Sequence, residues 1–286
     1  MVITVPRHAI PSDEAASRAE MLDARASRRI DGLEQRPEDF NSAFGASLLA
    51  AQFHCAADPR AADLPTWEAW VSAMQVGSAL FAAATAAGGT VSCRIADKTR
   101  TLRATGPQHY TDAGNWLAAF WLAVICREQG RMNHLADVPI SVLRDSAAVF
   151  DDYIYAWVEA LQSAWRRGGD IGGLLATAMD GTAPDAVHVA ETETVLKVMY
   201  PPIELFRLYA DRQPDRFNEA LLDSLRWHKD YWAQDEERSD SSPGFVALGP
   251  LAISCLAYDA GFPIEVESEY LPSHLLRGSW LNEFET

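Results

Sequence analysis

The sequence lacks any long apolar run, which argues against a membrane-spanning protein. No window approaches the roughly 18 uninterrupted apolar residues of a transmembrane helix, and the N-terminal stretch MVITVPRHAIPSDEAA does not follow the pattern of a secretory signal. Basic residues are also scarce, 24 against 40 acids, which gives a formal net charge of −16. Such a chain repels nucleic acids and anionic membranes and attracts basic partners or cations. We therefore expect a cytoplasmic protein that binds neither nucleic acid nor membrane.

Cysteine is sparse as well. The four cysteines lie far apart in the sequence and follow no pair spacing typical of a disulfide framework or a zinc site: Cys55, Cys93, Cys126 and Cys255. Three of them have apolar neighbours, as in AVICRE and AISCLAY. We expect buried, reduced thiols rather than disulfides, since this is the usual state of isolated cysteines in such surroundings.

Recognisable catalytic and cofactor motifs are missing from the sequence. The seven histidines form no His-Glu-x-x-His motif and no close pair. Neither a Gly-x-Ser-x-Gly nucleophile turn nor a phosphate-binding glycine loop occurs, because the glycine-rich segment GGDIGG follows a helical pattern and not a strand. We therefore predict no catalytic residue, no metal ligand and no cofactor.

The sequence does contain apolar residues at helical spacing over most of its length. In the first such segment, which starts at Ser12, they recur every three or four positions: Ala15, Ala19, Leu22, Ala26, Ile30 and Leu33. Only residues 90–105 change to a period of two, at Val91, Cys93 and Ile95, which predicts a β-hairpin. The expected fold is all-α, built of packed antiparallel helix pairs with one small β-hairpin near residues 90–105.

The breaks between the helical segments are short: HLADVPI, DGTAP, MYPP and DRQP. The only stretch with the composition of a flexible loop, Asp235 to Gly244, is too short for a domain linker. We therefore expect a single helical domain over residues 1–286, with a regular helical repeat as the alternative arrangement, although no clean period of about 34 residues is present.

Large apolar residues of the predicted helices should form the core of this domain. Most of the nine tryptophans lie within predicted helices, where packing is a commoner role than ligand binding. We expect burial of the following residues: Trp67, Trp70, Leu80, Phe81, Trp116, Phe120, Trp157, Leu205, Phe206, Leu251 and Leu256.

Negative charge is concentrated near the C-terminus. From Asp230 to Thr286 there are 11 acids and 2 bases, a net charge of −9. Within this region, the stretch GFPIEVESEYLP alternates apolar and acidic residues between two prolines, which bias the preceding residues toward extended geometry. In an extended chain Ile264, Val266 and Tyr270 face one way and the three glutamates face the other. We expect an extended connector that is attached to the core by its apolar side.

Two interpretations of this acidic region remain open. It is either a solvated, solubilising face or a binding surface for a basic partner, because a patch of one sign speeds encounter and discriminates between partners. Six residues are the candidates for such a surface: Asp235, Glu236, Glu237, Glu265, Glu267 and Glu269.

Five long blocks of the sequence resemble the immunity 49 family of bacterial immunity proteins. They are TWEAWVSAMQVGSALFAAATAAGGTVSCRI, AGNWLAAFWLAVICRE, YPPIELFRLYA, FNEALLDSLRWHKDYW and GFVALGPLAISCLAYDAGFPIEVESEYLP, and they extend from Thr66 to Pro272. The resemblance implies a cytoplasmic, largely helical member of a polymorphic toxin system that binds and neutralises a cognate toxin domain. It implies no catalytic residue and no cofactor, and it favours a partner-binding surface because many toxin domains that attack nucleic acids are basic.

The sequence thus predicts a non-enzymatic immunity protein whose partner is a basic toxin domain. Two alternatives belong to other classes of protein. The first is a metal-assisted hydrolase that uses the C-terminal carboxylates, and the second is a helical scaffold that binds several unrelated partners. The oligomeric state does not follow from the sequence.

Overall fold

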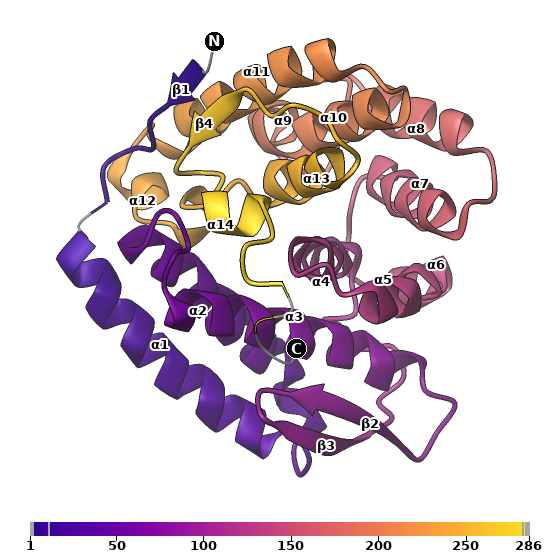
Figure 1. Cartoon of the computed structure of the whole chain (residues 1–286). Helices are drawn as coiled ribbons and strands as arrows, with labels where there is room; N and C mark the ends of the chain where they lie inside the picture. The colour runs from indigo at the N-terminus through magenta and orange to yellow at the C-terminus, as the bar shows by residue number, and fades with distance from the viewer. Residues whose placement is uncertain (1–2, 11, 282, 284–286) are drawn as a thin grey trace. The chain divides into compact units, whose positions relative to one another are not determined.

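The computed structural model describes residues 3–10, 12–281 and 283 of the chain (Figure 1). Within these residues helices predominate, and the strands form two sheets of two strands each. The predicted all-α fold is therefore confirmed. The chain divides into two compact units, which we call the N-terminal unit (Pro11–Ala148 and Trp280–Thr286) and the C-terminal unit (Met1–Ile10 and Val149–Ser279). The prediction that they form one domain stays a prediction.

The N-terminal unit is built on three long helices in which α1 packs against α2, and α2 against α3. The apolar stripe predicted for the first helix is buried along its whole length. A short 3-10 turn precedes α2 and starts with Pro37, whose missing N–H is not needed in a first turn. The helical elements of this unit are α1 (Ser12–Gly32), η1 (Pro37–Asp39), α2 (Phe40–Ala57), α3 (Leu64–Thr85), α4 (Ala113–Ile125), α5 (Gln129–Ala136) and α6 (Ile140–Arg144).

The predicted β-hairpin is present as β2 (Thr90–Ile95) and β3 (Lys98–Arg103), paired antiparallel. It lies beside α3 in Figure 1. Hydrogen bonds to three helices attach it: Arg100 donates to Asp31 of α1 at 2.9 Å, and the backbone N–H of Ala96 donates to Gln75 of α3 at 2.7 Å. Arg131 of α5 donates to the carbonyl of Arg94 at 3.2 Å. Its position is therefore set by polar contacts as well as by the buried side chain of Ile95.

The C-terminal unit contains two helix pairs, α7 with α8 and α10 with α11, and the buried helix α13 packs on α10. The stretch from Asp235 to Gly244 has the composition of a loop but forms two short helical turns. The helical elements are α7 (Tyr153–Arg166), α8 (Ile171–Asp180), α9 (Thr192–Thr194), η2 (Val195–Met199), α10 (Tyr200–Ala210), α11 (Pro214–Trp232), α12 (Glu236–Ser239), η3 (Ser242–Gly244), α13 (Leu248–Asp259) and α14 (Ser273–Leu276).

The break predicted at MYPP is wrong, because the helix continues through it. α9, η2 and α10 follow one another without a gap, and η2 is wound as a π-helix. Pro201 and Pro202 lie in the first turn of α10 and lack the N–H groups that a regular α-helix would use at this point. π-Helices are rare and occur mostly as single turns within α-helices, frequently at functional sites.

A second small sheet was not predicted. Strand β1 (Ile3–Val5) pairs in parallel with β4 (Val266–Ser268), so that Ile3 lies opposite Val266 (Figure 1). The hydroxyl of Ser268 also donates to the carbonyl of Val5 at 2.7 Å. The pairing buries Val5 and Val266, which lie more than 250 residues apart in the sequence.

The expected core is confirmed with one exception. All of the large residues named above are buried except Leu256, which is half-buried. Cys55, Cys126 and Cys255 are buried thiols, as expected, whereas Cys93 is half-buried in the hairpin. Trp227 departs from the general pattern of the helical tryptophans because 39% of it is exposed on α11.

Candidate functional site

The C-terminal connector has the predicted alternation. Val266 and Tyr270 are buried and Ile264 is half-buried, while the three glutamates between them are exposed. The extended geometry that the two prolines favour is realised as β4 and its flanking residues. The glutamates Glu265, Glu267 and Glu269 therefore point to solvent along one edge of the C-terminal unit.

The end of this connector is joined to α12 through His8. The hydroxyl of Tyr270 lies 2.8 Å from Nδ1 of His8, and Nε2 of the same ring donates to the carbonyl of Ser239 at 3.1 Å. With Nε2 donating, Nδ1 of the neutral ring accepts from the tyrosine. Burial lowers the pKa of His8, which favours this neutral form. The β1–β4 sheet and α12 are thus joined by a buried polar chain.

Two of the six predicted carboxylates have structural roles. Asp235 caps α12 by accepting a hydrogen bond from the backbone N–H of Arg238 at 2.8 Å. Its carboxylate also lies 3.9 Å from the guanidinium of Arg238 and forms an ion pair with it. Glu269 lies 3.9 Å from the buried guanidinium of Arg7. The charges of these two acids are partly balanced within the chain.

The other four predicted carboxylates form no ion pair with any described residue: Glu236, Glu237, Glu265 and Glu267. All four are exposed. The structure therefore keeps two groups of open negative charge on the C-terminal unit, one on α12 and one along β4. Because such charges retain their hydration and their field, they are able to attract a basic surface at a distance.

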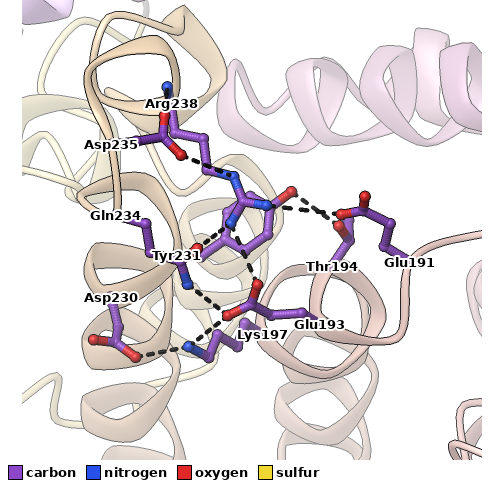
Figure 2. A network of polar contacts seen from close by, with 9 residues as sticks. All are labelled: Glu191, Glu193, Thr194, Lys197, Asp230, Tyr231, Gln234, Asp235 and Arg238. Atoms are coloured by element: carbon purple, nitrogen blue, oxygen red, sulfur yellow. Dashed lines mark hydrogen bonds and ion pairs between the residues drawn. The ribbon is translucent and has the colours of Figure 1, made fainter.

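A polar network that the sequence did not predict lies beside α12 (Figure 2). Its centre is Arg238, whose guanidinium contacts Glu193 at 3.4 Å and Glu191 at 3.7 Å. The same group lies over the ring of Tyr231, 4.2 Å from its centroid. A planar guanidinium suits such a site because it can stack on an aromatic ring while it donates at its edge. Arg238, one of two bases in the acidic C-terminal region, therefore connects α12 to the segment before η2.

Lys197 extends the same network along the helices. Its ammonium lies 2.7 Å from Asp230 on α11 and 3.0 Å from Glu193 one turn earlier on its own helix (Figure 2). The hydrogen bonds from Lys197 and Gln234 lower the pKa of Glu193 to about 2, so this carboxylate is charged at neutral pH. The network positions η2 against α11 by alternating charges.

A groove of about 530 Å³ lies in the N-terminal unit. Its walls carry Asp23 and Ile30 of α1 and Trp67 of α3, and the hairpin contributes Arg94 and Arg100. Asp23 already contacts His54 at 2.8 Å, and Arg100 donates to Asp31. The volume suits a small molecule or a side chain of a partner, but none of the six predicted residues lies here.

Neither a metal cluster nor a membrane-spanning helix occurs in the described part of the chain. No three side chains of His, Cys, Asp or Glu converge there in a way that could hold an ion. His228 is a core residue: its Nε2 donates to the carbonyl of Gly244 at 3.1 Å, and burial lowers its pKa to about 4. Within the described residues no helix is long and apolar enough to cross a membrane.

Comparison with known proteins supports the resemblance found in the sequence. No curated protein and no solved structure matches the chain. A family model described as Immunity protein 49 matches residues 58–275, which includes all five blocks quoted above. The family name indicates an immunity protein. Because the match covers most of the sequence, the chain belongs to the Immunity protein 49 family.

Proposed function

We propose that this protein binds a cognate bacterial toxin domain and neutralises it by occupation, without catalysis. The family match over residues 58–275 carries this proposal. The exposed carboxylates of α12 and β4 support a protein-binding role, because they offer uncompensated charge at the surface of the C-terminal unit. In this proposal the protein acts in the cytoplasm, where an immunity protein meets its toxin before export.

The proposed partner is basic. The chain has a net charge of −16, and more than half of that charge lies in the C-terminal 57 residues. Long-range attraction between surfaces of opposite charge raises association rates and weakens as salt is added. A toxin domain with a positive surface, as nucleic acid-binding domains have, would be attracted by the negative charge of this protein.

The decisive experiment uses the cognate toxin domain, to be sought among the coding sequences that neighbour the gene for this chain. Co-expression of that domain with this protein should restore growth that the toxin domain alone abolishes. Purified together, the two should form a complex of fixed stoichiometry, and the mass of the toxin domain should be unchanged after incubation. Growth rescue without a complex, or a chemically altered toxin domain, would contradict neutralisation by binding.

The same purified protein separates the other two classes of function. Metal analysis should find no stoichiometric, tightly held ion, whereas a hydrolase of the metal-assisted kind would retain one. Affinity capture from the producing cells should recover one toxin rather than several unrelated proteins, which a scaffold would bind.

A further inference from the structure

The groove of the N-terminal unit has the size and the lining of a small-molecule site. Its volume of about 530 Å³ is typical of such sites. Its apolar wall includes Ala26 and Ile30 of α1, Ala50 of α2 and Val71 of α3, and all four side chains are buried. The hairpin adds charged residues to this wall. Apolar walls hold the body of a small molecule, and the polar groups of the site decide which molecule it binds.

Arg100 of the hairpin lines this groove and has unused hydrogen-bonding capacity. The residue is only 6% exposed. A guanidinium carries five N–H groups, yet within the described residues that of Arg100 donates only to Asp31, at 2.9 Å, and its Nε has no partner. Asp31 is itself exposed and also lies 4.0 Å from Lys98. The charge of Arg100 is therefore only partly balanced, and a buried cation in this state favours a further anion.

A second buried donor lines the same groove. Trp67 of α3 is 3% exposed, and its indole N–H has no hydrogen-bond partner among the residues that the structure describes. Buried donors without an acceptor are rare in folded proteins, and each one calls for an explanation. Donors on α3 and on β3 thus lack an acceptor in the walls of one groove.

The charged residues of the groove differ in burial according to their sign. Arg100 is buried and Arg94 is half-buried, whereas Glu68 and Asp97 are exposed. Asp23, the other acid of the walls, is engaged in the hydrogen bond described above. Solvent and salt screen exposed charges more than buried ones. The interior of the groove therefore favours an anion, while the exposed acids disfavour an anion with several charges.

We propose that this groove binds a small organic carboxylate, whose charged group contacts Arg100 and whose apolar body lies against Ile30 and Val71. A guanidinium suits a carboxylate because it forms paired, charge-assisted hydrogen bonds with it. A small ligand suits this chain better than an acidic protein surface, which the net charge of −16 would repel. The groove contains none of the carboxylates proposed for the toxin surface, so this inference goes beyond the proposed function and does not depend on it.

The experiment measures binding to the full chain by calorimetry with two probes of the same shape, the carboxylate 1-naphthoate and its neutral analogue 1-naphthamide. 1-Naphthoate should bind at about one molecule per chain and about 10-fold more tightly than 1-naphthamide, because charge-assisted hydrogen bonds are the stronger ones. Arg100→Gln should weaken the binding of 1-naphthoate by about 10-fold. The control is Arg103→Gln, which removes the same charge from an exposed position of the same strand outside the groove, and its affinity should stay within about 2-fold of wild type.

A second variant tests the groove without changing its charge. Ser72 is half-buried in the wall that α3 provides, so Ser72→Leu should fill part of the space and abolish binding. Three results overturn the site: no binding of 1-naphthoate to wild type, equal affinity for both probes, or wild-type affinity in either folded variant. Circular dichroism and thermal unfolding show whether each variant is folded, and Ser72→Leu decides if Arg100→Gln is not. The toxin domain is absent from this experiment, so failure of the site leaves the proposed function standing.

Discussion

The hydroxyl of Tyr270 lies 2.8 Å from Nδ1 of His8, a hydrogen bond between side chains that are 262 positions apart. The backbone N–H of His8 donates to the same hydroxyl at 3.1 Å. Tyr270 is fully buried and His8 nearly so. This contact holds the segment after β1 against the end of β4, and it continues to Ser239 of α12. The glutamate-bearing connector is therefore attached to the C-terminal unit by a specific polar contact in addition to its apolar side chains.

Replacing Tyr270 with phenylalanine should lower the free energy of unfolding by about 1–3 kcal/mol, because buried His8 loses its partner. The measurement is urea unfolding of wild type and variant. Tyr258→Phe serves as the control, since Tyr258 is 41% exposed on α13, and its unfolding free energy should change by less than about 0.5 kcal/mol. Equal stability of wild type and Tyr270→Phe would show that water replaces the lost hydroxyl.

Acidification should destabilise the protein through His228. Burial lowers the pKa of this histidine to about 4, whereas the unfolded chain has the ordinary value near 6.5. Above about pH 7 neither state binds the proton. As the pH falls from about 6.5 toward 4, the unfolded chain binds it first, and the loss of stability approaches about 3 kcal/mol near pH 4.

The test of this pH dependence compares wild type with His228→Gln, whose amide can still donate to the carbonyl of Gly244. Unfolding free energies measured between pH 8 and pH 4 should fall more steeply for wild type. The carboxylates titrate in both proteins, so they cancel in the difference. Parallel curves would mean that folding does not lower the pKa of His228.

Changing Glu265, Glu267 and Glu269 together to glutamine should slow association with the cognate toxin domain and reduce its dependence on salt, because charges at a rim act mainly on encounter. The measurement is the association rate at several salt concentrations. The free energy of unfolding should change by no more than about 1 kcal/mol, since the three side chains are exposed and solvent screens the long 3.9 Å contact of the half-exposed Glu269 with the buried guanidinium of Arg7. Identical rates and slopes would remove these residues from the interface.

Replacing a buried tryptophan with alanine should lower the free energy of unfolding more than the same replacement of the partly exposed Trp227. Trp116 is fully buried, donates to the carbonyl of Leu135 at 2.9 Å and stacks on Phe120 at 4.9 Å. Trp116→Ala should therefore lower the free energy of unfolding by about 3–5 kcal/mol. Trp227→Ala is the comparison, and we expect it to lower the free energy of unfolding less than Trp116→Ala in the same urea titration, because 39% of Trp227 is exposed. Similar losses in both would contradict the assignment of Trp227 to the surface.

Features that depend on neighbouring residues could be predicted from the sequence. The stripe of α1 and the hairpin of β2 and β3 follow from periods of 3.6 and 2, which adjacent side chains establish by themselves. The same reason explains the outward glutamates around Val266, because two prolines and strict alternation specify an extended chain with one apolar side. The resemblance to the Immunity protein 49 family could also be recognised from the sequence, because it is carried by continuous blocks of residues.

Features that depend on distant residues were decided by the tertiary structure alone. The pairing of β1 with β4, the bond of His8 to Tyr270 and the contact of Arg238 with Glu193 need partners that only packing brings together. The exposure of Trp227 is of the same kind, because its helical pattern matches that of the buried tryptophans and only the facing helix decides which side is covered. Local periodicity thus determined the helices and the acidic edge, while packing determined which of those residues remain open to a partner.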